Sequence, residues 1–128
     1  MPISRNVRFM LTVHSYQKCS TCRNAVAWLR KKGIPFDERS IRETPPDEAE
    51  LAAMLEAKAN SVRALFNTSG QDYRALELKD KLPQMFRAEA FALLRSNGML
   101  VKRPFAADPK RGIFLLGFKE EEWEKAFA

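Results

Sequence analysis

The two cysteines of this chain, Cys19 and Cys22, stand three positions apart where one apolar pattern ends and another begins. Before them, residues 8–16 are rich in strand-forming side chains and too short for a helix. After them, residues 20–32 carry apolar side chains at helical spacing, and Gly33 stands where a helix usually ends. A C-x-x-C pair between a strand and a helix is typical of a redox-active dithiol. The chain must therefore form a strand, a dithiol turn and a helix in that order.

The later elements extend this start into an α/β order. Residues 34–40 follow a Lys-Lys-Gly-Ile-Pro turn and predict a second strand, parallel to the first, which makes a βαβ unit. Residues 45–97 predict a mostly helical insert. Two strands at 105–107 and 113–118 flank a turn that is short enough for a hairpin, and a helix closes the chain after Glu120. We expect a βαβ, insert, ββα order within a single domain, 1–128.

Composition limits the setting and the partners. A chain of 128 residues with 45% hydrophobic content can form one packed core without disulfide staples. It shows neither a signal-peptide pattern nor a spanning apolar stretch, so we expect a cytoplasmic protein that does not enter a membrane. The net charge of +6 favours an anionic partner, or only a solvated basic surface. No basic run interleaved with aromatic residues occurs, so no direct nucleic-acid binding is expected.

The two cysteines are expected to have different roles. Cys19 stands at the start of the predicted helix, where unpaired N–H groups, the helix dipole, Lys18 and Arg23 favour a thiolate. Cys22 lies one turn further along and should be more buried. Positions three apart in a helical turn also satisfy the Cα separation of a disulfide. We therefore predict Cys19 as the catalytic nucleophile and Cys22 as the resolving thiol.

Other interpretations of the same residues remain open. Paired cysteines can be mere packing residues, and they can form half of a zinc site. Tetrahedral zinc needs four ligands, and His14 is the single histidine of the chain, so no metal is expected. His14 itself fits a buried strand histidine better than a catalytic base.

Three arginines outside the cysteine motif could hold an oxyanion with a planar, permanently charged fork: Arg63, Arg74 and Arg103. Arg103 is the best placed, because Pro104 follows it at the entry to a predicted strand. A proline there is where such a sheet would place a cis peptide bond. The alternative is a surface arginine beside a turn proline.

The chain resembles the ArsC/Spx family of the thioredoxin/glutaredoxin superfamily over nearly its whole length. The resemblance rests on residues 16–24 (YQKCSTCRN), 61–65 (SVRAL), 66–74 (FNTSGQDYR), 99–105 (MLVKRPF) and 116–123 (LGFKEEEW). It implies an α/β fold with a thioredoxin-like sheet of about four strands and a helical insertion. It also implies that Cys19 is the redox cysteine and that Pro104 is the cis-proline.

The resemblance implies two functions. In arsenate reductases of this family a cysteine attacks arsenate, arginines that match Arg63 and Arg103 hold the oxyanion, and glutathione with glutaredoxin completes the reduction. We expect a thiol oxidoreductase of this type, acting on a small oxyanion or a disulfide, with glutathione as a co-substrate, glutaredoxin or thioredoxin as partners and no bound cofactor. Residues 113–118 (IFLLGF) lack a further arginine of those enzymes, which leaves arsenate turnover open.

The alternative is an Spx-like redox-sensing regulator that binds RNA polymerase and uses the C-x-x-C pair as a disulfide switch. A redox-inert descendant of the fold is a third reading, and an ordinary Cys19 pKa would favour it.

Overall fold

The computed structural model describes residues 10–128, which form two compact units. The sheet unit comprises residues 10–40 and 103–128, and the helical unit is Ile41–Lys102. The helical segment predicted at about 45–97 falls inside the helical unit. The assignment of all 128 residues to a single domain stays a prediction.

The sheet unit has the predicted βαβ and ββα halves. Within the described residues its four strands are β1 (Leu11–Ser15), β2 (Phe36–Ser40), β3 (Phe105–Asp108) and β4 (Ile113–Leu116), in the spatial order β2-β1-β3-β4. The β1 and β2 strands are parallel, whereas β3 is antiparallel to both β1 and β4. Arg8 and Phe9, which the sequence assigns to the first strand, lie outside the described residues.

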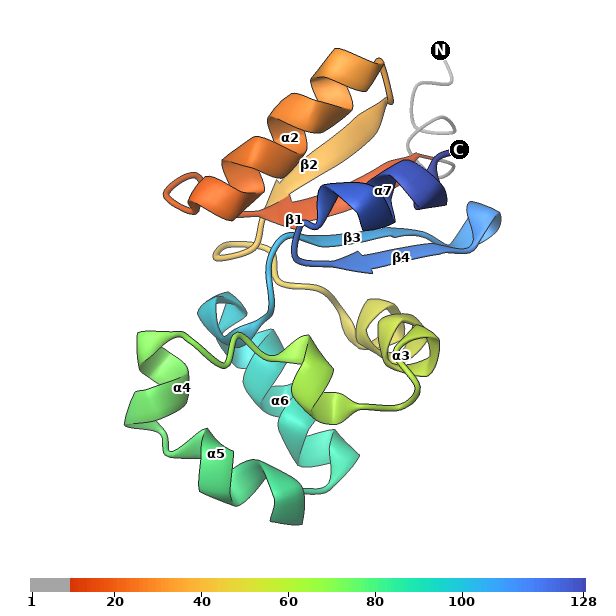
Figure 1. Cartoon of the computed structure of the whole chain (residues 1–128). Coiled ribbons are helices and arrows are strands. Elements are labelled where there is room, and N and C mark those ends of the chain that lie inside the picture. Colours follow the sequence, from red (N-terminus) through yellow and green to blue (C-terminus); the bar gives the residue numbers. More distant parts are fainter. Residues whose placement is uncertain (1–9) are drawn as a thin grey trace. The chain divides into compact units, whose positions relative to one another are not determined.

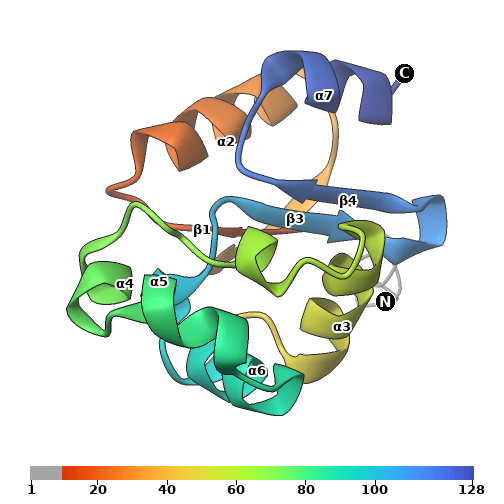
Figure 2. The ribbon, with the colours of Figure 1, turned by 60° about the horizontal axis from the view of Figure 1, so that its bottom comes forward.

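Two helices lie on the same face of this sheet, α2 (Ser20–Lys32) and α7 (Glu120–Ala126), as Figures 1 and 2 show. Trp28 of α2 meets Trp123 of α7 edge to face, with ring centroids 6.0 Å apart. The Nε1–H of Trp123 donates to the Gly117 carbonyl at 3.1 Å, which pairs the polar atom of a fully buried side chain. The buried residues of this core are Leu11, Val13, Ala25, Trp28, Leu29, Ala106, Ile113, Leu115 and Trp123.

The α2 helix begins and ends where the sequence predicts. Cys19 is its N-cap residue, and Gly33 is its C-cap in the left-handed conformation, with φ of 70°. Its last turn carries Arg30, Lys31 and Lys32, which suit the negative end of the helix dipole. Because α2 packs on the sheet through Ala25, Trp28 and Leu29, its first turn is held at the end of β1.

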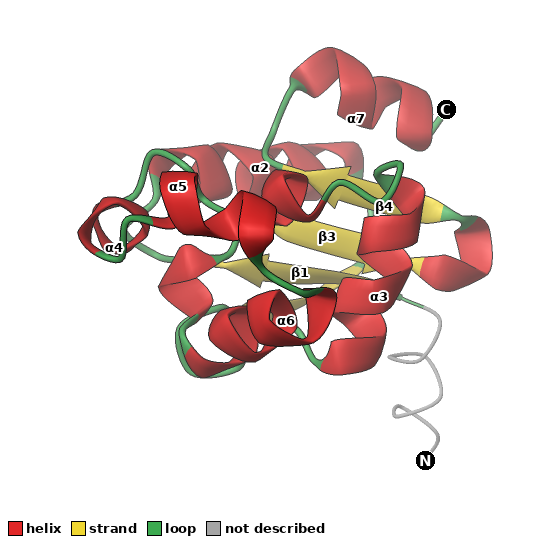
Figure 3. Cartoon of the chain, turned by 90° about the horizontal axis from the view of Figure 1, so that it is seen from below, coloured by secondary structure: helices red, strands yellow, loops and turns green. Residues whose placement is uncertain are grey.

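The helical unit contains α3 (Glu48–Ala57), α4 (Gln71–Ala75), α5 (Leu78–Lys81) and α6 (Arg87–Ser96), joined by loops and 3-10 turns (Figure 3). A capping box between Asp47 and Glu50 starts α3. Within residues 10–128, no helix has the length and apolar character needed to span a membrane.

Candidate functional site

Cys19 lies between the end of β1 and the first turn of α2. Its backbone is extended, and its sulfur accepts a hydrogen bond from the Cys22 backbone N–H at 3.3 Å. Its own N–H donates to the Tyr16 carbonyl at 2.9 Å, and its carbonyl accepts from the Arg23 N–H at 3.0 Å. These bonds place the Cys19 sulfur at the positive end of α2, as the sequence predicts.

The pKa of Cys19 is lowered from its ordinary value of 9.0. Partial burial alone would raise it, because burial disfavours the charged thiolate. Hydrogen bonds from the Cys22 thiol, from the Cys22 backbone and from the Arg103 side chain act in the opposite direction, together with the positive charge of Arg103. Their combined effect exceeds that of burial, and the thiolate is favoured.

Cys22 is perturbed in the other direction. Its side chain is 1% exposed, and burial is the largest cause that raises its pKa, to about 12. The hydrogen bond that it gives to Cys19, and the negative charge of the Cys19 thiolate, raise it further. The two thiols interact, and Cys19, the less buried of the two, loses its proton first.

Arg103 brings the C-terminal half of the sheet unit to the dithiol. It immediately precedes β3, and its bond to Pro104 is cis. Its guanidinium carbon lies 5.3 Å from the centroid of the Tyr16 ring, and its side chain hydrogen bonds to Cys19. The sequence predicts that Lys18 and Arg23 favour the Cys19 thiolate. In the structure Arg23 Nη1 donates to the Gln17 carbonyl at 2.9 Å, and the cation that acts on Cys19 is Arg103.

The other predicted residues belong to other elements of the fold. Arg63 is exposed on the 3-10 turn Val62–Leu65, and Arg74 in α4 donates to the Ser69 carbonyl at 2.7 Å. Both belong to the helical unit, and the role of Arg63 in holding an anion stays a prediction. His14 is buried in β1, with its ring edge to face against Phe105 at 5.6 Å.

A cavity of about 380 Å³ opens beside the dithiol turn, lined by Ser15, Tyr16, Gln17, Cys22, Arg23, Val26, Ala27, Arg30 and Glu38. The Ser15 hydroxyl donates to Glu38 at 2.7 Å, and Arg30 Nη2 lies 3.8 Å from the same carboxylate. The Glu38 carboxylate on this wall is therefore already paired with other groups of the protein.

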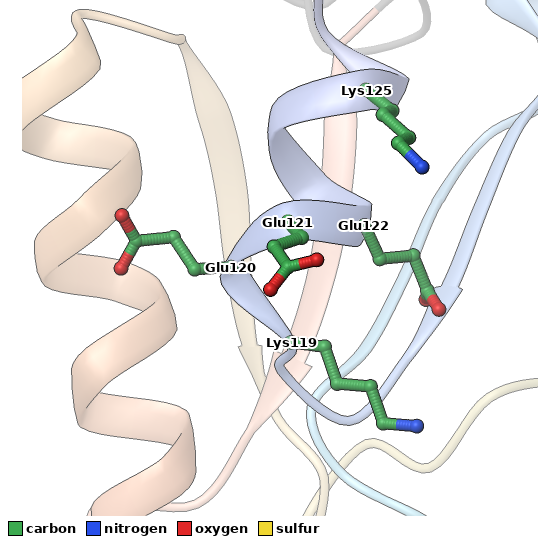
Figure 4. A pocket seen from close by; sticks show the side chains of 5 residues that line it. All are labelled: Lys119, Glu120, Glu121, Glu122 and Lys125. Carbon is green, nitrogen blue, oxygen red and sulfur yellow. The ribbon is translucent and has the colours of Figure 1, made fainter.

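A second cavity, of about 510 Å³, lies at the start of α7 and is lined by Lys119, Glu120, Glu121, Glu122 and Lys125 (Figure 4). These side chains are exposed charges of both signs, with no nucleophile among them. Across residues 10–128, no group of three or more histidine, cysteine or acidic side chains is arranged to hold a metal. The dithiol turn is thus the best candidate for chemistry.

The chain is similar to several known proteins. The model of the ArsC family matches residues 14–126. The chain is 43% identical to the uncharacterized protein YusI of Bacillus subtilis, over 92% of this chain and 98% of that protein. It is 33% identical to the global transcriptional regulator Spx of Enterococcus faecalis, over 88% of this chain and 83% of that protein.

A solved structure gives the same fold. It is that of a possible arsenate reductase from Streptococcus mutans, with a TM-score of 0.80 and 42% identity, covering 90% of this chain and 98% of that one. The α/β, thioredoxin-like fold expected from the sequence is confirmed.

Proposed function

The chain belongs to the ArsC family, and on that premise we propose that it is a thiol oxidoreductase with Cys19 as the attacking thiolate and Cys22 as the resolving thiol. The observation that carries the proposal is the opposite perturbation of two thiols on one helical turn. One sulfur accepts hydrogen bonds at the helix start beside Arg103, while the other is buried and keeps its proton. A nucleophilic thiol and a resolving thiol need these opposite protonation states.

With a disulfide substrate, the proposed reaction has two exchange steps. The Cys19 thiolate attacks one substrate sulfur, a bond forms between them, and the substrate disulfide breaks with release of its other half as a thiolate. Cys22 then loses its proton and attacks the Cys19 sulfur. The second half of the substrate leaves, and a Cys19–Cys22 disulfide remains. The substrate gains two electrons, and the two cysteines lose them.

The high pKa of Cys22 does not block the second step. Two of its causes are the hydrogen bond to Cys19 and the charge of the Cys19 thiolate. Both disappear once Cys19 is bonded to substrate. The pKa of Cys22 then falls, so the resolving thiol is activated only after the first bond has formed.

We further propose that Arg103, with Arg63, orients an anionic substrate, and that Pro104 shapes the same site. The substrate class is a small oxyanion or an anionic mixed disulfide such as that of glutathione. Glutathione, glutaredoxin or thioredoxin would return the disulfide to the dithiol. We place this activity in the cytoplasm, where such donors keep thiols reduced.

A second function has its own support. Relatives named global transcriptional regulator Spx match most of this chain, and residues 113–118 lack the further arginine expected of an arsenate reductase. The alternative is a redox switch in which formation of the Cys19–Cys22 disulfide changes affinity for RNA polymerase.

Turnover measurements decide between them. The purified chain is assayed with glutathione, glutaredoxin and a coupled NADPH-consuming reductase, on arsenate and on a glutathione mixed disulfide in parallel. We expect turnover of at least one substrate, complete loss in Cys19→Ser, and a trapped substrate adduct in Cys22→Ser. No turnover of either substrate with glutathione, glutaredoxin or thioredoxin, combined with redox-dependent capture of purified RNA polymerase, would reject the enzyme and support the switch.

A further inference from the structure

Tyr16 contacts the dithiol site through both its backbone and its side chain, and no sequence motif predicts this. Its carbonyl accepts the Cys19 N–H at 2.9 Å, and its backbone hydrogen bonds to the Cys22 thiol. Its ring faces the Arg103 guanidinium, whose carbon lies 5.3 Å from the ring centroid, within the range of a cation–π contact. The first two contacts use the main chain and are open to any residue except proline. The third depends on the aromatic side chain.

We propose that Tyr16 is a positioning residue whose ring holds the Arg103 guanidinium beside the Cys19 sulfur. This inference rests on the proposed function, because it concerns the site where Cys19 acts. The aromatic face attracts the cation and limits the orientations of a long side chain that would otherwise sample many rotamers. Arg103 can then give its hydrogen bond and charge to one place.

Burial supports this assignment. Both Tyr16 and Arg103 are partly buried, so the contact is less diluted by water than a surface pair would be. The guanidinium is planar and stacks on a ring while its N–H groups point outward in the same plane. A stacked arginine can therefore keep its donors for the thiolate or for an incoming anion. Lysine has no such planar group.

The test is a double-substitution cycle read out at the thiol. Tyr16→Leu removes the aromatic face and keeps an apolar side chain, Tyr16→Phe keeps the aromatic face, and each is combined with Arg103→Ala. All proteins carry Cys22→Ser, so that Cys19 is the single reactive thiol. The measurements are the rate of iodoacetamide alkylation at neutral pH and the pH dependence of that rate.

We expect Tyr16→Leu to slow alkylation about two- to fivefold and to shift the pH profile upward, as loss of one cation–π contact implies. Tyr16→Phe should restore the original rate. In the Arg103→Ala background, Tyr16→Leu should change nothing further. Phe36→Leu is a matched control, because it removes the ring under Arg30, 5.9 Å from that guanidinium carbon, and it should leave the rate unchanged.

An equal effect of Tyr16→Leu with and without Arg103 would overturn the proposal, since Tyr16 would then act as a packing residue of the turn or of the cavity wall. No effect in either background would overturn it too. These readouts need no substrate. A chain that shows the predicted coupling but no turnover would reject the proposed function and retain this inference.

Discussion

Cys22 donates its backbone N–H to the Cys19 sulfur across 3.3 Å, so one cysteine caps the helix in which the other is buried. Capping by sulfur links the ionisation of Cys19 to the first turn of α2. The same short segment thus sets the state of both thiols.

The first prediction concerns the titration of the pair. Thiolate absorbance should rise in two separate steps, one below pH 9.0 and one near pH 12. Cys22→Ser should remove the upper step. In Cys19→Ser the single remaining step should occur below pH 12, because the charge and hydrogen bond of Cys19 no longer raise the pKa of Cys22. Two overlapping steps near the ordinary value would contradict the assignment.

The second prediction is a pH dependence of stability. The lowered pKa of Cys19 adds stability that is complete above pH 9.0 and is lost as pH falls through the folded-state value. Cys22 has the opposite sign: its contribution is present below pH 9.0 and is lost as pH rises toward 12. Between pH 9.0 and pH 12, the free energy of unfolding should therefore decline more steeply with rising pH in the wild type than in Cys22→Ser. Urea denaturation at a series of pH values measures both slopes, and equal slopes would refute the prediction.

The third prediction concerns the charge of Arg103. Arg103→Ala should slow alkylation of Cys19 by about tenfold at neutral pH, because the thiolate loses a charged hydrogen-bond donor. Arg103→Lys should retain part of the rate through its charge. Arg23→Ala is the control, since Arg23 is bonded to the Gln17 carbonyl, and we expect a small change. A larger effect of Arg23 than of Arg103 would show that the wrong cation was identified.

The fourth prediction concerns packing in the helical unit. A Cβ atom at Gly98 would clash with the Ile41 carbonyl oxygen, which is backbone and cannot move aside cheaply. We expect Gly98→Ala to reduce the free energy of unfolding by about 2 kcal/mol or more. Gly33→Ala is the comparison. That glycine has φ of 70° but open space around it, so strain alone should cost about 1 kcal/mol. Similar losses for the two variants would argue against the close approach.

Local signals in the sequence were strong enough to predict the sheet unit. Both ends of the helix Ser20–Lys32 were predicted correctly, because the dithiol turn precedes it and Gly33 ends it. The hairpin of β3 and β4 follows from two apolar runs around a turn of proline and glycine. Each of these elements is defined by residues that are neighbours in the chain.

The helical unit was harder to predict. Residues 76–81 carry no clear helical or strand pattern in the sequence. In the structure α4 ends at Ala75 and α5 begins at Leu78, with Glu77 at φ of 54° between them. A glutamate in a left-handed conformation carries no sequence signal, unlike glycine. Short helices also bury only one or two side chains each, so periodicity cannot reveal them.

The candidate site shows the same limit. The two cysteines were identified from their spacing and their place between a strand and a helix, whereas the contact of the Tyr16 ring with Arg103 joins distant parts of the sequence. Local patterns also favoured Lys18 and Arg23 as the charges near Cys19, because they are its neighbours in the chain. Pairing of β1 with β3 is what brings Arg103 there instead.

The hydrogen bonds that Cys19 accepts exist in full only while its sulfur is a thiolate. They therefore stabilise the reduced protein and not the disulfide, which raises the reduction potential of the pair. In the proposed cycle, the same hydrogen bonds favour the return of the Cys19–Cys22 disulfide to the dithiol by a thiol donor. Replacing Arg103 would lower the reduction potential of the pair, and it would also make Cys19 a slower nucleophile.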